Sequence, residues 1–481
     1  MRFMSRPLAF ALALALAPAA GASDLMDAYE LARQSDPTLA GAEARRGAQG
    51  ETVVQSRSVL LPQINGEVSL TDQDIDATRV GETPQSDGSV TFGPVTSNSD
   101  TRTRSYNVTL RQSIYDHSNY TRLRASKDRS SQSGADLDAA VDQLMLRVAE
   151  AYFGVLTAID SVVFARGEKH AVGRQLDQAD QRFEVGLTAI TDVHEARARF
   201  DSARATEIAA LNALDDAREA LAEITGHWME ALAGLSDEFE PSLPEPTDLA
   251  AWVDAALANN PLIHSRELAL RATGHDIATA RAGHLPSLGG FASYGDNATW
   301  GDFNANNISF PANSISDGPT VGLTLTVPIF SGFATQSRVR QNILLRDAAE
   351  QDLEAQERAI VRQTRSFYRS LITGISEIEA RRQGQVSAQS ALEATEAGFE
   401  VGTRTIVDVL LSQQLLFQAQ RDYSTARHNF LVNTLRLKQA AGVIQASDLE
   451  QVNRLLTEDA EARLQTGDED ADSDPDGSDR G

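Results

Sequence analysis

Hydrophobic and polar positions follow two different periods along this chain. In residues 25–60, small and apolar side chains recur three and four positions apart, which predicts helix, and Asp36-Pro37 interrupts the pattern. In residues 105–115 and 321–330, apolar and polar side chains alternate, which predicts strands with one dry and one polar face. The apolar positions are Tyr106, Val108, Leu110, Ile114, Val321, Leu323, Leu325, Val327 and Ile329, and the polar ones are Asn107, Thr109, Arg111, Ser113, Gly322, Thr324 and Thr326.

Long helical stretches follow the predicted strands. Residues 123–226 and 330–442 keep the helical spacing and contain no proline, and Gly186 and Gly402 divide each stretch in two. A helix of about 60 residues is roughly 90 Å long, far more than the width of an ordinary domain. Helices of this length must bury an apolar stripe against one another, as coiled coils do. The sequence therefore predicts a mainly α-helical protein with a small β portion.

One nine-residue phrase occurs twice. VGLTAITDV at residues 185–193 matches VGTRTIVDV at residues 401–409, and other similar segments recur at nearly the same interval. The chain is therefore predicted to be two copies of one unit. The predicted segments are a signal peptide (1–22), a first repeat of helix, two strands and long helices (23–226), a linker (227–248), a second repeat (249–442), a C-terminal segment (443–465) and a disordered acidic tail (466–481).

The N-terminus and the composition favour export from the cytoplasm. Arg2 and Arg6 precede a short apolar run, and AGA at residues 20–22 is typical of a signal-peptide cleavage site. No other stretch is expected to supply the roughly 20 apolar residues that a transmembrane helix needs. The net charge of −25 argues against a nucleic-acid partner. The acidic run DEDADSDPDGSD at residues 468–479 is expected not to fold.

Four strands are too few to close a barrel around water. An open sheet would leave unpaired backbone groups in lipid. Closure then needs several chains, which predicts a homo-oligomer with a shared β-barrel at one end and a helical cylinder at the other. The polar strand faces should line water and the apolar faces should meet lipid. Partner strands are expected near residues 62–71 and 286–294, and polar extracellular loops at about 72–102 and 296–318.

These segments closely resemble the TolC family of outer-membrane efflux proteins. The resemblance rests on LLPQ, QSIYD, AYFGVLTAID, RQLDQADQRFEVGLTAITDV, EITG, GHLPSL, VPIFSG and EAGFEVGTRTIVDV, which together span nearly all of residues 23–455. It implies a homotrimer whose chains give four strands each to a twelve-stranded barrel in the cell outer membrane, with a helical tunnel through the periplasm. Residues 227–248 and 443–465 would lie in an equatorial region of that tunnel.

The resemblance also implies partners and cargo. The partners are a periplasmic adaptor and an inner-membrane pump of the ABC, RND or MFS type. The cargo is drugs, small toxic compounds or type I secreted proteins, carried to the exterior by a tripartite pump.

Residues around the repeated phrase form the periplasmic entrance in this family. Gly186 and Gly402 supply the helix turns. By resemblance, Asp192 and its neighbour Thr191 join Arg404 to clamp the helix pairs across the entrance. The same clamp includes Gln175, Glu396 and Phe399.

Two positions depart from the family pattern. Phe399 stands where the family has a tyrosine, so one hydroxyl bond is lost and the Asp192–Arg404 pair should carry more of the closed state. Asp408 matches the upper of two acidic rings that face the lumen, but the lower position is Leu411, which puts strong cation selectivity in doubt. From the sequence alone, Asp408 is equally well a solvated helix residue.

The chain carries no catalytic signature. It lacks G-x-S-x-G and a P-loop, so no enzyme activity and no cofactor are expected, and a partner must supply energy. His264, His275 and His284 are not spaced one helical turn apart, and no metal site is expected. A non-channel periplasmic coiled-coil adaptor or structural tether would also explain the helices. Such a protein has no need of strands with an apolar face.

Overall fold

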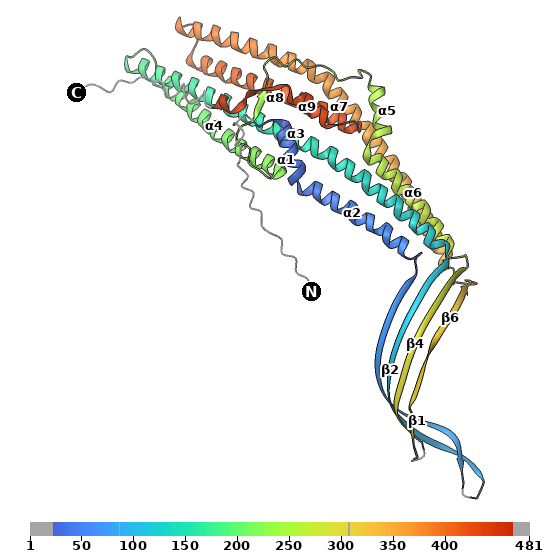
Figure 1. The fold of residues 1–481 in the computed structure, drawn as a ribbon. Coiled ribbons are helices and arrows are strands. Elements are labelled where there is room, and N and C mark those ends of the chain that lie inside the picture. The colour runs from blue at the N-terminus through green and yellow to red at the C-terminus, as the bar shows by residue number, and fades with distance from the viewer. Residues whose placement is uncertain (1–22, 86, 306–307, 465–481) are drawn as a thin grey trace, which may run out of the picture. The chain divides into compact units, whose positions relative to one another are not determined.

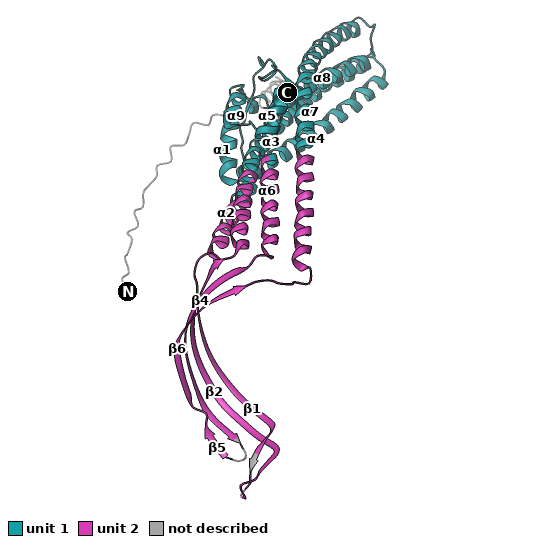
Figure 2. Ribbon diagram, turned by 90° about the vertical axis from the view of Figure 1, so that its right-hand side faces the viewer, with its two compact units in different colours: residues 1–43, 137–263, 357–481 teal, residues 44–136, 264–356 magenta. Residues whose placement is uncertain are grey.

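The computed structural model describes residues 23–464 apart from 86 and 306–307 (Figure 1). The predicted signal peptide (1–22) and acidic tail (466–481) lie outside the described residues. The chain divides into two compact units, which Figure 2 colours separately. Unit 1 contains the described residues up to Glu43, Leu137–Ile263 and the described residues from Glu357 onward, and unit 2 contains Ala44–Asp136 and His264–Gln356.

Helices make up most of the described chain, so the prediction of a mainly helical protein with a small β portion is confirmed. The longest helices, α3 and α7, have 68 and 67 residues, or roughly 100 Å each. The helices are α1 (Leu25–Ser35), α2 (Pro37–Ser58), α3 (His117–Glu184), α4 (Ile190–Thr225), α5 (Leu249–Asn259), α6 (Pro261–Ala282), α7 (Ala334–Glu400), α8 (Ile406–Ala440) and α9 (Ala446–Asn453). The strands are β1 (Gln63–Pro84), β2 (Val90–Tyr115), β3 (Ala233–Leu235), β4 (Ser287–Ala305), β5 (Ile308–Pro311), β6 (Ser314–Thr326) and β7 (Leu456–Asp459).

The first helical region breaks where the sequence predicts. α1 ends at Ser35 and α2 starts at Pro37, because proline tolerates the first position of a helix but not its interior. The Asp36 carboxylate accepts a hydrogen bond from the Leu39 backbone N–H at 3.0 Å and an ion pair from Arg147 at 2.5 Å. Burial disfavours the charged carboxylate, but these donors outweigh it and hold the pKa of Asp36 below its usual range.

Four long strands of unit 2 form one antiparallel sheet in the order β1-β2-β4-β6, and the short β5 pairs with β4. Figure 1 shows the long strands side by side in one curved layer. Val108 lies opposite Gly66 and Tyr294, and Leu323 lies opposite Gly290. Among the described strands, none pairs with the outer edge of β1 or of β6.

The two faces of this sheet differ in chemistry. Neighbouring side chains of a strand point to opposite faces, and residues in register share a face. The first face, named the apolar row, leaves large side chains exposed: Val321 is 79% and Leu323 is 72% exposed. The apolar row includes Ile64, Val68, Leu70, Tyr106, Val108, Leu110, Leu288, Ala292, Tyr294, Val321, Leu323 and Leu325. The opposite face, named the polar row, includes Asn65, Glu67, Ser69, Asn107, Thr109, Arg111, Ser287, Gly289, Phe291, Ser293, Thr320, Gly322, Thr324 and Thr326.

The prediction of loops at residues 72–102 and 296–318 is wrong over most of their length. β1 continues to Pro84 and β2 begins at Val90, so the first segment is a long hairpin with a short turn. Most of the second segment belongs to β4, β5 and β6.

Contacts across the first hairpin explain why polar residues form strands there. Arg102 of β2 forms an ion pair with Asp72 of β1 at 2.6 Å. The Asn98 side chain donates to both Asp74 and Asp76, each at 2.9 Å. Cross-strand pairs of this kind stabilise a sheet between residues that are distant in sequence. Local composition, which suggested a loop, does not reveal them.

The apolar core of unit 1 gathers side chains from α1, α3, α4, α8 and α9. Tyr152 of α3 is fully buried, and its hydroxyl donates to the Ala233 carbonyl of β3 at 2.8 Å. Contrary to the sequence prediction, α3 contains a stretch long and apolar enough to cross a membrane, and 56% of that stretch is buried inside the chain. Packing in this core accounts for its hydropathy.

A C-terminal segment is tied to the helices of unit 1. β7 pairs with β3, and Arg463 donates to the buried Asp160 of α3 at 3.0 Å. Arg218 of α4 pairs with Glu461 at 2.5 Å, and Arg166 of α3 donates to the Leu464 carbonyl at 2.9 Å. The last described residues are therefore an integral part of unit 1.

We expect Gly442→Ala to destabilise the protein by about 2 kcal/mol, more than Gly186→Ala at about 1 kcal/mol. Both glycines have positive φ, 67° and 75°. A Cβ at Gly442 would also lie 2.6 Å from backbone atoms of Asn259 and Asn260, whereas one at Gly186 meets nothing within 4 Å. Thermal unfolding of the purified protein in detergent measures both. Equal losses would contradict the backbone clash.

Candidate functional site: the polar row and the helix tips

The polar row presents small and hydroxyl side chains rather than a packed core. Thr324 lies opposite Gly289, and Gly322 lies opposite Phe291. The Phe291 ring lies over Gly322, where an added Cβ would come within 2.6 Å of it. A cavity of about 680 Å³ lies over this row and is bordered by Asn107, Thr109 and Arg111. This face suits contact with water, and the opposite apolar row suits contact with lipid.

The two predicted glycine turns adopt the same backbone geometry. Gly186 follows α3 with φ 75°, and Gly402 follows α7 with φ 77°. The Gly186 N–H donates to the Phe183 carbonyl at 2.9 Å, and the Gly402 N–H donates to the Phe399 carbonyl at 3.1 Å. Left-handed glycine just past the last turn is a common way to end a helix.

Asp408 is the third residue of α8 and caps that helix. Its carboxylate accepts from the Thr405 backbone N–H at 3.0 Å and from the Thr405 hydroxyl at 2.9 Å. In return, the Thr405 hydroxyl accepts from the Asp408 N–H at 3.3 Å, which completes a capping box. These bonds hold the pKa of Asp408 below its usual range.

Asp192 occupies the third position of α4, which corresponds to the place of Asp408 in α8. Its carboxylate accepts a hydrogen bond from the Thr188 hydroxyl, and its backbone N–H donates to the Ala189 carbonyl at 3.0 Å. A carboxylate in the first turn also interacts favourably with the helix dipole. Both acids therefore have a local role in starting a helix.

The tips of the two helical hairpins pack together inside one chain. Val172 and Ala179 of α3, Val193 and Ala196 of α4, and Ile406 and Leu410 of α8 form one buried cluster. Phe399 of α7 packs against this cluster and against a second one formed by Leu392, Val409 and Leu416. The Arg182 guanidinium lies over the Phe399 ring at 4.6 Å from its centre. This cation–π contact joins α3 to α7.

The remaining predicted clamp residues are not brought together within one chain. In the part of the chain that the structure describes, Arg404 and Asp192 form no ion pair with each other: Asp192 accepts from Thr188, and the charge of Arg404 acts on Asp408. The Arg404 N–H donates to the Gly398 carbonyl at 3.1 Å, and its side chain lies against Gly398, where a Cβ would approach Arg404 Cγ to 2.7 Å. Thr191, in the first turn of α4, is exposed.

Two glutamines near the tips have unsatisfied oxygens. Gln175 and Gln413 each bury a side-chain oxygen that has no hydrogen-bond partner among the described residues. Glu396 accepts from the Gln413 side-chain amide at 3.5 Å. Buried polar atoms are usually paired, so these two oxygens are exceptions among the described residues.

Sequence reasoning missed Arg182 and Thr188. A signal for Arg182 was present, because the repeated phrase is preceded by RFEVG in the first half and by GFEVG in the second. Arg182 thus corresponds to Gly398. The structure gives each a separate reason: the arginine stacks on Phe399, and the glycine leaves room for Arg404.

Comparison with known proteins agrees with this architecture. The family described as outer membrane efflux protein matches residues 28–227 and 252–443. The chain is 38% identical to outer membrane protein TolC of Vibrio cholerae over 441 residues, which cover 91% of this chain and 95% of that protein. It is 30% identical to the alkaline protease secretion protein AprF of Pseudomonas aeruginosa, over 94% of this chain and 91% of that protein.

Solved structures show the same fold. The Campylobacter jejuni CmeC outer membrane channel superposes with a TM-score of 0.70 at 16% identity and covers 97% of both chains. The Vibrio cholerae outer membrane protein VceC superposes with a TM-score of 0.69 at 17% identity, over 87% of this chain and 96% of that chain. The fold and the matched sequence define a channel protein of the outer membrane. The chain belongs to the TolC family of outer membrane efflux proteins.

Proposed function

We propose that three copies of this chain form a channel whose strands close into one barrel. The channel exports drugs, small toxic compounds or type I secreted proteins to the exterior. One observation carries the proposal: a sheet with an exposed apolar row, a polar opposite face and two edge strands without a described partner. In lipid, every backbone group must be paired, so such a sheet has to close on further copies. Three four-stranded sheets give a twelve-stranded barrel.

The difference between the apolar and polar faces of the sheet argues against the adaptor or tether hypothesis. Such a protein would have no reason to expose Val321 and Leu323 in a continuous apolar row. A periplasmic adaptor and an inner-membrane pump are the proposed partners, because the sequence contains no P-loop to supply energy from a nucleotide. We further propose that the chain is not an enzyme and needs no cofactor; among the described residues, no three His, Asp or Glu side chains gather as a metal site.

The two halves are proposed to be copies of one unit. In each half, two helices lead into long antiparallel strands, and two long helices with a glycine turn follow. The family match also falls in two stretches, one per half. Duplication would place Asp192 and Asp408 at corresponding positions of two adjacent helix hairpins.

The helix tips are proposed to form the periplasmic entrance. Arg404 of one chain would reach Asp192 and Thr191 of the next, and Gln175 and Glu396 would belong to the same clamp. The contact between Arg182 and Phe399 adds a second attachment inside each chain, in place of the hydroxyl bond that phenylalanine cannot make.

Asp408 is proposed to form an acidic ring at the same entrance. In three copies, repulsion between the carboxylates would raise their pKa and oppose the lowering by the helix cap. Leu411, three residues further on, is 46% exposed and adds no second ring of charge.

Deletion of the gene tests the proposed function. The deleted strain should become more sensitive to drugs and detergents, or should lose secretion of a large exoprotein, and outer-membrane fractions of the parent strain should contain a heat-stable trimer. A parent strain without that trimer, together with a deletion strain unchanged in both assays, would refute the proposal.

A further inference from the structure

An arginine-rich cavity lies in unit 2 where the strands join the helices. Its volume is about 600 Å³, and it lies among α3, α6 and α7. Asp276, Thr279 and Ala280 of α6, followed by Gly283 just past its end, recur at helical spacing and form one side of the cavity. Three arginines also border it: Arg122, Arg129 and Arg338.

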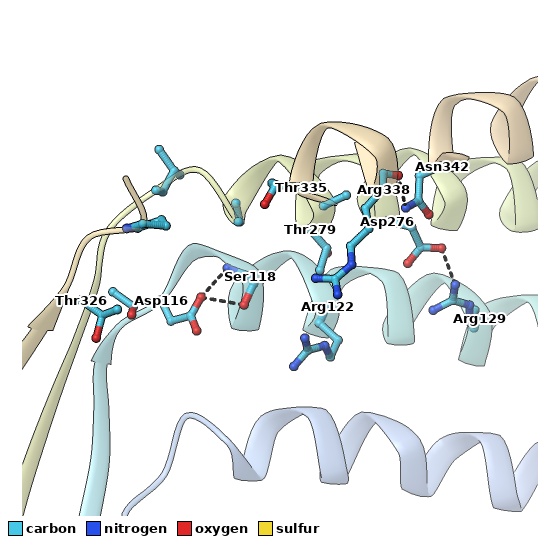
Figure 3. Close-up of a pocket in the computed structure, with 16 residues that line it drawn as sticks. Asp116, Ser118, Arg122, Arg129, Asp276, Thr279, Thr326, Thr335, Arg338 and Asn342 are labelled. Carbon is cyan, nitrogen blue, oxygen red and sulfur yellow. Dashed lines mark hydrogen bonds and ion pairs between the residues drawn. The ribbon is translucent and has the colours of Figure 1, made fainter. Parts of the chain in front are cut away.

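Only one of these three guanidinium groups has a carboxylate partner. Arg129 pairs with Asp276 at 2.5 Å. Arg122 makes one long hydrogen bond, 3.5 Å to the Asn119 side-chain oxygen. The Arg338 side chain makes no hydrogen bond or ion pair within the described residues, and Figure 3 shows it directed from α7 toward α3. Arg122 and Arg338 therefore have no ion-pair partner among the described residues, and the three arginines and two aspartates that border the cavity leave one excess positive charge.

Asp116, the acid of this cavity that lies next to the strands, already accepts hydrogen bonds from a neighbouring residue. The Asp116 carboxylate accepts from the Ser118 N–H at 2.9 Å and from the Ser118 hydroxyl at 2.6 Å, and both bonds are drawn in Figure 3. Asp116 thus caps α3 and forms no ion pair with Arg122 or Arg338 among the described residues, but its charge still offsets one arginine of the cavity. In a chain with a net charge of −25, this local excess of positive charge is unusual.

The cavity opens on the polar side of the sheet. Ser287 and Thr326 border it, lie opposite each other in register and belong to the polar row. The neighbouring cavity over the polar row shares Asp116 and Ser287 with it and contains Arg111. The guanidinium groups therefore lie on the face that would line water in the proposed channel.

We propose that this cavity binds an oxyanion, either the carboxylate or the phosphate group of a solute inside the channel, through Arg122 and Arg338. The proposal rests on the proposed function, because that function makes the polar face the channel wall. Guanidinium is planar, always charged and suited to paired hydrogen bonds with carboxylate and phosphate oxygens. An anion between Arg122 and Arg338 would also relieve the repulsion between two like charges.

This site gives the channel two regions of opposite charge preference. The proposed Asp408 ring attracts cations at the entrance, whereas the arginine cavity attracts anions at the junction of strands and helices. Solutes with an acidic group would therefore bind transiently at the cavity. Multivalent anions that bind there would block the channel.

The test uses full-length trimers in planar bilayers of neutral phosphatidylcholine, with tripolyphosphate added on the barrel side. Wild-type channels should be blocked, and the double variant Arg122→Gln/Arg338→Gln should need at least tenfold more tripolyphosphate for half block. Arg346→Gln is the matched control, since Arg346 lies on α7 but pairs with Glu350 at 2.8 Å. Its block should equal that of the wild type.

Two further arms keep the outcomes distinct. Soluble carboxylic acids on the barrel side should compete with tripolyphosphate, whereas phosphatidylglycerol in the bilayer should not, because the cavity faces the lumen. Competition by phosphatidylglycerol alone would show that the cavity faces lipid and would overturn the proposal. Equal block of wild-type and double-variant channels overturns the proposed site while leaving the channel function intact. Failure of every variant, wild type included, to conduct would instead refute the proposed function.

Discussion

Leu323→Arg should prevent assembly of the trimer, whereas Thr324→Arg should be tolerated. Leu323 belongs to the apolar row and is 72% exposed, so in the proposed barrel its side chain meets lipid. An arginine facing lipid costs about 2–4 kcal/mol near the membrane midplane and less near the interfaces. Three copies multiply this cost. Thr324 belongs to the polar row, where water would solvate the new charge.

The heat-stable trimer band from outer-membrane fractions measures this effect. The two positions are adjacent in β6 and receive the same side chain, so each variant is the control for the other. Assembly of Leu323→Arg together with failure of Thr324→Arg would show that the faces are assigned the wrong way round.

Arg404→Ser should raise the conductance of trimers in planar bilayers. In the proposed entrance, Arg404 clamps Asp192 of the next chain, and an exposed pair of this kind contributes about 1 kcal/mol. Three pairs give about 3 kcal/mol, which shifts the ratio of open to closed entrances on the order of 100-fold. Within the chain, the Arg404 side chain packs against Gly398, and its charge contributes to lowering the pKa of Asp408.

The contact between Arg182 and Phe399 predicts that opening proceeds in two stages. Arg404→Ser alone leaves this contact in place, so the double variant Arg404→Ser/Arg182→Ser should conduct more than the single one. Arg346→Ser, which removes an arginine paired within its own helix, is the control and should conduct like the wild type. An unchanged conductance in correctly assembled Arg404→Ser trimers would remove Arg404 from the entrance.

The sequence predicted those parts of the fold that depend on local periodicity. Alternation of Leu323 and Thr324 identified a strand and its two faces, and the Asp36-Pro37 break separated α1 from α2. The hairpin at residues 72–102 was missed, because its aspartates, serines and glycines resemble loop composition. Their stability comes from partners such as Arg102, about thirty positions away in sequence.

The candidate site was predictable to a different degree. Gly186 and Gly402 were identified because few other residues adopt a left-handed backbone at a helix end. The contact between Arg182 and Phe399 was not predicted, because the periodicity of a sequence does not reveal which helices lie next to each other. The clamp between Asp192 and Arg404 stays a prediction, because it would form between chains.

The free outer edges of β1 and β6 have a genetic consequence. In the proposed trimer, each edge is completed by the neighbouring chain, so one chain that cannot pair leaves a gap in the whole barrel. In a cell that makes equal amounts of normal and edge-defective chains, random mixing leaves only about one trimer in eight free of defective subunits. Mutations on these edges should therefore act as dominant alleles, whereas loss of expression of one gene copy should be recessive.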